Sequence, residues 1–369
     1  AQARLNNPAN KMTNLAVTGT NGKTTVACLT QSIIQYAGQA CGLIGTIFYD
    51  TSKQRHHAPM TTPDCIEIAR MTDEMARAGA KYMITEASSH ALHQNRLAAI
   101  KFKAAAFTNL TGDHLDYHKT RKNYLQAKSL LFSSLPKDSY AILNAQSKDS
   151  KYLEKQTPAK VLYYSIEDPA EITAEIISSD VNGTKFNLKY KNQSQPVNSP
   201  LIGKFNISNN LAAAGLCLAA GFDLKTVAKG LQNPNIIPGR LEKVPSDKNF
   251  AVLVDYAHTD DALKNVLATL KPICKAKLIV VFGCGGDRDR TKRPRMAKVA
   301  EQLADHIIVT SDNPRSEQPE YIIGEIMTGF DNPVADNIEV EIEREQAIKL
   351  AIDIAQKDDI ILIAGKGHE

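Results

Sequence analysis

The sequence lacks any apolar run of the roughly 18 or more residues that a membrane span needs, and no charged-then-apolar segment opens it as a signal peptide would. Its six cysteines show no C-x-x-C spacing, so they indicate neither a zinc site nor a disulfide framework, and we expect reduced thiols in a cytoplasmic protein. Neither charge dominates, because 44 Lys and Arg oppose 40 Asp and Glu, a net charge of +4. That surplus is too small to indicate a nucleic-acid partner, although it suits an anionic substrate.

The chain has the composition of a globular protein, with 369 residues of which 43% are hydrophobic and 23% charged. Short apolar runs alternate with amphipathic stretches of helical period, which predicts the α/β class. We expect a mostly parallel sheet in a domain over 14–238 and a Rossmann-like α/β domain over 239–369, with Pro and Gly marking the boundary near 238–240. Residues 1–13 form a polar lead, which we interpret as a linker remnant without an element. The last strand-like run passes into a Gly-rich loop, so we expect a trimmed chain.

The predicted strands cover 14–18, 82–85, 104–108, 140–143, 251–255, 278–282, 306–310 and 360–363. The predicted helices cover 23–37, 71–78, 124–135, 206–220, 260–270, 294–303, 321–327 and 344–355. Between them, residues 172–191 alternate as β-strands do, with Asn182 and Gly183 as the turn of a hairpin.

A glycine-containing loop lies between the first predicted strand and helix. Its glycines let the backbone curl so that N–H groups face a polyphosphate. Lys23 can neutralise the β and γ phosphates, and the Thr24 hydroxyl can reach Mg²⁺. The loop is a shortened phosphate loop, because Val17 stands where the full pattern has a glycine. It predicts an ATP site but alone does not separate a kinase, an ATPase and a ligase. The predicted contacts are Gly19, Thr20, Asn21, Gly22, Lys23, Thr24 and Thr25.

Eleven short motifs, taken in order, resemble those of the Mur ligase family. In the first half they are TGTNGKTT (18–25), TTPD (61–64), EASSHALHQNR (86–96), FTNLTGDHLDYH (107–118), YLQAKSLLF (124–132) and GKFNISN (203–209). In the second half they are PGRLEKV (238–244), VDYAHTDDAL (254–263), FGCGGDRDRTKRP (282–294), SDNPRSE (311–317) and AGKGHE (364–369). The resemblance runs from about Leu15 to Glu369 and is closest to the branch of the family that adds meso-diaminopimelate.

The resemblance implies ATP-driven amide-bond formation in peptidoglycan precursor synthesis. The γ-phosphate would pass to the terminal carboxylate of UDP-MurNAc-L-Ala-D-Glu, and the amine of meso-diaminopimelate would attack the acyl phosphate. It also implies Mg²⁺, with Mn²⁺ as an alternative, and we expect a monomer. The sequence departs from the family at Met60, Gly112 and Asp260. The family's N-terminal uridine-nucleotide domain has no counterpart before the phosphate loop, and the tail after GKGHE is missing.

The resemblance assigns the reaction centre to a few residues. Glu86 and His114 each follow an apolar strand-like run, where open parallel sheets hold ligands, and an oxygen with an imidazole suits Mg²⁺ or Mn²⁺. A lone helical lysine such as Lys128 is usually a solvated charge, but the family has a carbamylated lysine in this motif, an anion able to help bind a second metal. With Lys23 these are the predicted catalytic residues. Thr24, Glu86, His114 and carbamylated Lys128 are the predicted metal ligands.

Three further sets of contacts follow from the resemblance. Those to the UDP-MurNAc-dipeptide are Thr61, Thr62, Ser88, Gln94 and Arg96. Those to ATP, beyond the phosphate loop, are Asn206, Asn209, Arg240, Asp255 and His258. Those to meso-diaminopimelate are Arg288, Asp312, Asn313, Pro314, Arg315, Gly365 and Glu369. In the last pocket, Arg315 would pair with the distal carboxylate and Glu369 would hold the distal ammonium.

Simpler interpretations of the same residues remain open. Asn209 is also typical of a helix entry, Asp255 of a turn after a strand, and the DNPR segment of a capped helix start. Arg240 follows an inferred hinge, from which it could reach ATP on closure. His90 beside two serines does not indicate a hydrolase, because no G-x-S-x-G surrounds them.

Two alternative functions belong to different classes. A folylpolyglutamate synthetase-like amide ligase shares the phosphate loop and metal residues, but it is not expected to carry DNPR together with SSHALHQNR. A non-catalytic nucleotide-binding fragment is the other alternative, because the uridine-nucleotide domain has no counterpart. Phosphate release with the UDP-MurNAc-dipeptide, with and without meso-diaminopimelate, discriminates among the three.

Overall fold

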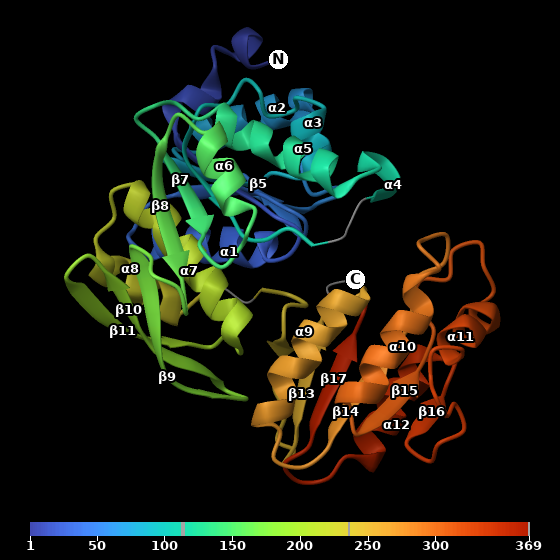
Figure 1. The fold of residues 1–369 in the computed structure, drawn as a ribbon. Coiled ribbons are helices and arrows are strands. Elements are labelled where there is room, and N and C mark those ends of the chain that lie inside the picture. The colour runs from blue at the N-terminus through green and yellow to red at the C-terminus, as the bar shows by residue number, and fades with distance from the viewer. Residues whose placement is uncertain (112–114, 235–236, 368–369) are drawn as a thin grey trace. The chain divides into compact units, whose positions relative to one another are not determined.

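The computed structural model describes residues 1–111, 115–234 and 237–367. The chain forms two compact units, Ala1–Asn235 and Ile236–Glu369, each of which is considered by itself (Figure 1). Each unit has a largely parallel sheet with helices packed on it, so the predicted α/β class is confirmed.

The sheet of the first unit is parallel in its centre and antiparallel at both edges. Its strands are β1 (Thr13–Thr18), β2 (Cys41–Ile44), β3 (Phe48–Asp50), β4 (Arg55–His57), β5 (Tyr82–Glu86), β6 (Phe102–Phe107), β7 (Tyr140–Asn144), β8 (Lys160–Ser165), β9 (Ile172–Asp180), β10 (Gly183–Tyr190) and β11 (Gln193–Ser199). They follow the order β11-β10-β9-β8-β7-β6-β1-β5-β2-β3-β4. Because β1 pairs in parallel with both β5 and β6, the loops after these three strands leave the sheet at the same edge.

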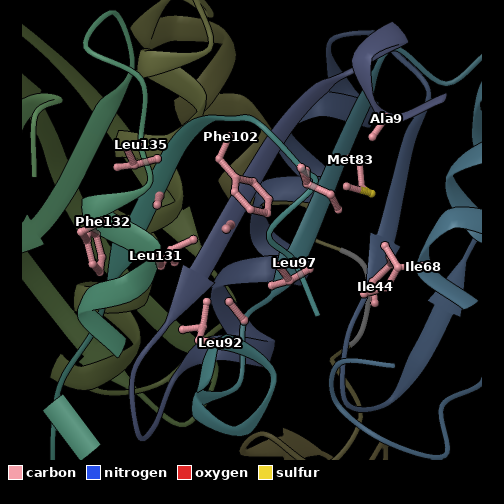
Figure 2. Close-up of a cluster of buried hydrophobic side chains, with 14 of the residues drawn as sticks. Ala9, Ile44, Ile68, Met83, Leu92, Leu97, Phe102, Leu131, Phe132 and Leu135 are labelled. Atoms are coloured by element: carbon pink, nitrogen blue, oxygen red, sulfur yellow. The ribbon is translucent and has the colours of Figure 1, made fainter. Parts of the chain in front are cut away.

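Helices cover both faces of this sheet (Figure 1). They are α1 (Lys23–Tyr36), α2 (Cys65–Arg77), α3 (Ser89–His93), α4 (Leu115–His118), α5 (Arg121–Ser133), α6 (Ser150–Gln156), α7 (Lys204–Ala219) and α8 (Leu224–Gln232). On one face, α2, α3, α5 and α6 share a hydrophobic core with the sheet. Figure 2 shows part of it, with Leu131 and Phe132 on α5, Leu92 on α3 and Phe102 on the sheet. On the other face, α1 contacts α7 and α8.

The prediction that residues 1–13 lack an element is wrong. They contain two 3₁₀ helices, η1 (Gln2–Leu5) and η2 (Pro8–Lys11), and Ala9 is buried in the core of the first unit. The Gln2 amide also donates to the Thr72 hydroxyl of α2 at 2.9 Å. Turns of four residues are too short to show a hydrophobic period, so the sequence alone does not reveal them.

Other elements begin earlier than predicted or were not predicted at all. Helix α2 starts at Cys65 and not at 71, because the Asp64 carboxylate caps it by accepting the amides of Ile66 and Glu67. Strand β11 adds a third strand to the predicted hairpin, whose turn lies between β9 and β10. The prediction also missed strands β2, β3, β4, β8, β12 and β16 and helices α3, α4, α6 and α8.

The second unit has a smaller sheet. Its strands are β12 (Glu242–Lys243), β13 (Ala251–Asp255), β14 (Leu278–Phe282), β15 (His306–Val309), β16 (Ile338–Val340) and β17 (Ile360–Ala364). They lie in the order β12-β13-β17-β14-β15-β16, and β12 is antiparallel to β13 while the described remainder is parallel. The loops after β17, β14 and β15 therefore leave from neighbouring strands at one edge.

Within residues 237–367, four α-helices accompany this sheet. They are α9 (Asp260–Leu270), α10 (Lys292–Leu303), α11 (Pro319–Met327) and α12 (Arg344–Ile354), and a 3₁₀ turn, η3 (Lys271–Ile273), follows α9. Ala347 and Ala351 of α12 pack on β13, β14, β15 and β17, whereas α10 contacts α9 and α11. At the first position of α9, Asp260 replaces the family's proline, and its charge suits a helix N-terminus.

In the part of the chain that the structure describes, no helix combines the length and the apolarity that crossing a membrane requires.

Candidate active site

The phosphate loop joins β1 to α1 in the first unit. Gly22 caps α1 with a φ of 87°, and a Cβ placed there would lie 2.4 Å from the Asn209 Oδ1 atom, so only glycine fits. The Lys23 Nζ atom donates to the carbonyl oxygens of Gly19 at 2.9 Å and Thr20 at 2.7 Å. Lys23 therefore lies folded over its own loop, at the N-terminus of a helix whose dipole attracts anions.

The loops after β1, β2 and β5 meet at Glu86. This carboxylate is fully buried and ends β5. Its Oε2 atom accepts the Thr24 hydroxyl at 3.0 Å and the Thr46 hydroxyl at 2.9 Å, while its Oε1 atom accepts the Thr46 amide at 2.8 Å. Gly45 gives the carboxylate room, because a Cβ there would lie 2.4 Å from Oε1. A hydroxyl and a carboxylate at this distance are an oxygen donor set of the kind that Mg²⁺ prefers.

Lys128 is buried below the phosphate loop. Its side chain extends from α5, is 1% exposed, and donates to the Gly19 carbonyl oxygen at 2.8 Å. The ammonium also lies 4.4 Å from the centre of the Tyr124 ring, and the Tyr124 hydroxyl lies 3.2 Å from the Thr20 hydroxyl. Lys128 is therefore not the solvated surface charge that a lone helical lysine usually is.

The predicted metal ligands are described only in part. Gly112 and His114 lie outside the described residues. Among residues 1–111, 115–234 and 237–367, no cluster of three or more His, Cys, Asp or Glu side chains could hold a metal. Thr24 and Glu86 are brought together, whereas the Lys128 Nζ atom donates to the Gly19 carbonyl oxygen of the phosphate loop.

The predicted muropeptide contacts form one network around the start of α3. The Thr62 hydroxyl donates to the Glu86 carbonyl oxygen at 2.6 Å and accepts the Ser88 amide at 3.1 Å. Arg96 donates to the Thr62 carbonyl oxygen at 2.7 Å and, through two other nitrogens, to the Gln94 side-chain oxygen. Thr61 joins the metal candidates, because its hydroxyl lies 3.1 Å from that of Thr46. Met60, the departure from the family, contacts Arg96 through its sulfur.

Two asparagines of α7 lie beside the phosphate loop. Asn206 and Asn209 are buried, and the Asn209 amide donates to the Asn206 oxygen at 3.1 Å. Asn206 in turn donates to the Ile202 carbonyl oxygen at 3.0 Å. Since Asn209 lies one turn inside α7, it is not the helix-entry residue that remained open, and it faces Gly22. On the opposite side of the loop, the Asn21 amide donates to Asn109.

In the second unit, Asp255 binds the backbone next to Arg240. Its carboxylate accepts the amides of Leu241 and Ala257, each at 2.8 Å. Burial raises the pKa of the Asp255 carboxyl, and the positive charge of Arg240 opposes that rise. The Arg240 guanidinium lies 4.9 Å from the centre of the Tyr256 ring, and exposed His258 hydrogen-bonds to the Tyr256 carbonyl oxygen. Asp255 thus holds the turn after β13 and also the backbone next to Arg240, one of the predicted ATP contacts.

The predicted amino-acid pocket lies at the edge where β14, β15 and β17 end. After β15, Arg315 adopts a left-handed φ of 53° and donates to the Gly286 carbonyl oxygen at 2.9 Å. Gly286 follows β14, and its amide donates to the Asn313 carbonyl oxygen at 2.9 Å. After β17, a Cβ on Gly365 would lie 2.5 Å from the Asp312 carboxylate. Three of the motifs therefore meet in one place.

The remaining members of that pocket differ in their setting. Arg288 is exposed and donates to the Asp287 carbonyl oxygen at 3.1 Å, so no partner from the other two loops holds it in the described residues. The backbones of Gly286 and Pro314 lie so close that a Cβ on Gly286 would stand 1.9 Å from the Pro314 carbonyl oxygen. The two loops can approach this closely because residue 286 is a glycine. Glu369 lies outside the described residues.

Sequence reasoning missed several residues that hold these sites. Thr46 follows β2, so the rule that ligands gather at the ends of parallel strands would have found it if β2 had been predicted. Arg344, at the first position of α12, donates to the carbonyl oxygens of Ala364 at 2.9 Å and Ser311 at 3.4 Å. It ties together two loops of the pocket and borders a cavity of about 420 Å³. No short motif marks such an arginine.

Comparison with known proteins finds matches to one family in both units. Residues 17–217 match the Mur ligase middle domain, and residues 239–367 match the Mur ligase glutamate ligase domain. A relative from Geobacillus kaustophilus, called UDP-N-acetylmuramoyl-L-alanyl-D-glutamate–2,6-diaminopimelate ligase, is 41% identical over 375 residues, which cover this whole chain and 76% of the relative.

Solved structures extend this likeness. A structure of a protein with the same name has a TM-score of 0.71 at 37% identity, covering 97% of this chain and 74% of that chain. A Mycobacterium tuberculosis folylpolyglutamate synthase has a TM-score of 0.78 at 19% identity, covering 99% of this chain and 90% of the other, which shows a shared fold alone. From its phosphate loop, the motifs of both units and the family models that match them, this chain belongs to the Mur ligase family of ATP-dependent amide ligases.

Proposed function

We propose that this chain adds meso-diaminopimelate to UDP-MurNAc-L-Ala-D-Glu during peptidoglycan precursor synthesis, in the cytoplasm and as a monomer. The relatives that carry the name of this reaction, at 39% to 44% identity over almost the whole chain, support the choice within the family. We further propose that residues 14–238 bind ATP and the muropeptide, and that residues 239–369 bind the amino acid.

The observation that carries the proposal is the convergence of three loops in the second unit. Asp312 and Arg315 come from the loop after β15, and Gly365 comes from the loop after β17. An amino acid with a second carboxylate needs an added cation, and the Arg315 guanidinium is held at its Nη1 atom by the carbonyl oxygens of Gly286 and Asn313. Such anchoring pre-orders the fork that would receive the distal carboxylate.

The phosphate loop of the first unit supports the use of ATP. Its amides at the start of α1 would cradle the phosphates, and Lys23 would leave the Gly19 and Thr20 carbonyl oxygens to neutralise them. Thr24 and Glu86 fit Mg²⁺ as an oxygen donor pair, and the ion would offset the crowded negative charge when bound. We include His114 and a carbamylated Lys128 in this site as part of the proposal.

The network at α3 supports binding of the muropeptide near the γ-phosphate. The Thr62 hydroxyl donates to the Glu86 carbonyl oxygen and accepts the Ser88 amide, so both residues hold their positions relative to the metal candidates. Arg96 supplies a cation to the same group of residues. The carboxylate of the dipeptide would be phosphorylated there, and the amine held by the second unit would displace phosphate from the acyl phosphate.

The proposal is tested by measuring the release of inorganic phosphate. The measurement is made with this chain and with a version extended by the N-terminal domain of the Geobacillus relative. We expect phosphate release to require UDP-MurNAc-L-Ala-D-Glu and to rise with meso-diaminopimelate far more than with lysine. Turnover with a folate and glutamate instead would favour the folylpolyglutamate alternative. ATP binding without turnover in the extended version would favour a non-catalytic nucleotide-binding role.

A further inference from the structure

Arg293 is a fully buried arginine beside the predicted amino-acid pocket. It is the second residue of α10, and its side chain is 0% exposed. Its Nη1 atom donates to one oxygen of Glu317 at 2.9 Å and to Glu325 at 2.7 Å, and its Nη2 atom donates to the other oxygen of Glu317 at 2.8 Å. Arg293 and Glu317 thus form a two-pronged ion pair. Sequence reasoning assigned a role to Arg288 and Arg315 but none to Arg293.

The pair holds the loop after β15, which carries Arg315, beside the loop after β14. Glu317 follows Arg315 by two residues, and its carboxylate also accepts the Asp287 amide at 2.6 Å. The Asp287 carboxylate returns the contact by accepting the amide and the hydroxyl of Ser316 at 3.1 and 2.7 Å. The loop after β14 and the loop after β15 are therefore cross-linked on the side of Arg315 that leads toward α11.

The chemistry of the Arg293–Glu317 pair suits it better to holding a loop in position than to raising the stability of the fold. A buried ion pair is often worth no more to folding than apolar side chains of similar volume, because both charges lose their hydration. A guanidinium and a carboxylate joined by two parallel bonds do, however, fix direction as well as distance. The arginine is thus suited to holding a loop at one orientation.

We propose that Arg293 is a positioning residue for the amino-acid substrate, which acts through Glu317 to hold the Arg315 loop where it selects an amino acid with a second carboxylate. This inference rests on the proposed function for the identity of the substrate. Arg293 itself touches neither ATP nor the reacting atoms in this scheme. Its loss should therefore affect recognition of the amino acid and spare recognition of ATP.

Kinetics of Arg293→Lys, Arg293→Met and Glu317→Gln in the extended chain test the substrate part. We expect KM for meso-diaminopimelate to rise by about 10²-fold in Arg293→Met, as small misplacements of a binding group do, with KM for ATP within about twofold of the parent. The preference for meso-diaminopimelate over lysine should fall, and Arg293→Lys should restore part of it. Arg290→Ala is the matched control, because exposed Arg290 binds the same Glu325 from the surface.

Hydrogen exchange on the chain itself tests the positioning part without any turnover. In Arg293→Lys, the amides of Asp287 and Ser316 should exchange at least about tenfold faster, while those of α9 keep their rates. Glu317→Gln serves the same purpose if the buried substitution prevents folding, since Glu317 is partly exposed. Unchanged exchange at Asp287 and Ser316, or an equal loss for both amino acids in the kinetics, overturns the inference. A parent that ligates no amino acid defeats the proposed function and leaves the exchange result to decide the role of Arg293.

Discussion

Lys128 donates a hydrogen bond to the carbonyl oxygen of Gly19 at 2.8 Å, from a side chain that is 1% exposed. Lys23 donates to the same oxygen at 2.9 Å, so two ammonium groups converge on one carbonyl of the phosphate loop. A carbamylated Lys128 would keep one N–H at Nζ for that carbonyl oxygen, but it would exchange its positive charge for a carboxylate. The modification would therefore place an anion beside the phosphate loop.

We expect Lys128→Ala to abolish ligation and short carboxylates to restore part of it, because they supply the anion that a carbamylated lysine would provide. Ligation measured with and without added formate or acetate checks this. Lys225→Ala, at a lysine near the start of α8, is the control and should behave as the parent does. An active Lys128→Ala, or an inactive one that no carboxylate rescues, would restrict Lys128 to bracing the phosphate loop.

Lys23→Ala should lower the ligation rate by a factor on the order of 10²–10³ or more, because the phosphates lose their principal cation in a site that excludes water. The fold should persist, since the two carbonyl oxygens that Lys23 contacts belong to its own loop. Phosphate release and circular dichroism together check this prediction. Activity within a factor of two of the parent would reject the assignment of the loop.

Thr46→Val should weaken the candidate metal site and lower the free energy of unfolding. The change removes the hydroxyl that donates to the buried Glu86 carboxylate at 2.9 Å, and a lost bond to a buried charge costs about 1.5–3 kcal/mol. Urea unfolding measures the loss, and the Mg²⁺ concentration needed for half-maximal ligation should rise. Thr46→Ser, which keeps the hydroxyl, is the control. A Thr46→Val protein as stable as the parent would mean that water replaces the hydroxyl.

The sequence predicted most strands and helices because their hydrophobic periods are long and clear, as at β13, β14 and α9. It missed β2, whose four residues include a glycine, and with β2 it missed Thr46. Motifs identified the residues that touch ligands, such as Lys23. Motifs do not identify the residues that support those groups. Arg293 lies inside the motif at 282–294, but the motif does not show that its side chain binds Glu317, and Arg344, which binds the Ala364 carbonyl oxygen, lies in none of the motifs. Only the packed structure shows which carbonyl or carboxylate each one holds.

The stability of the second unit should depend on the ionisation of Glu317. Hydrogen bonding to Arg293 lowers the pKa of this carboxyl from its ordinary value of 4.5 to about 2. A lowered pKa in the folded state adds stability above the unfolded pKa, and this stability is lost as pH falls from about 4.5 toward 2. Urea unfolding of the parent and of Glu317→Gln should therefore differ most near pH 7 and converge in acid. A difference that stays constant with pH would mean that the carboxylate charge is not involved.

Arg315→Ala should separate this chain from relatives that use other amino acids. The Arg315 guanidinium donates from Nη1 to the Gly286 carbonyl oxygen, so the loops of the pocket hold its positive charge in place. If it pairs with the distal carboxylate of meso-diaminopimelate, that carboxylate provides most of the discrimination against lysine. Leaving one partner of such a pair unpaired costs about 2–5 kcal/mol, or roughly 30- to several-thousand-fold in kcat/KM.

The loss in Arg315→Ala should therefore fall on meso-diaminopimelate, while lysine, already a poor substrate, loses much less and KM for ATP changes little. Arg315→Lys keeps the charge but not the two-pronged geometry, so it should recover only part of the selectivity. Lys298→Ala, a surface change on α10, controls for the loss of a nearby positive charge. The measurement is kcat/KM for both amino acids in the extended chain. If both fall by the same factor, Arg315 supports the backbone of its loop, where its φ of 53° already marks an unusual conformation, and the distal carboxylate must find its cation elsewhere.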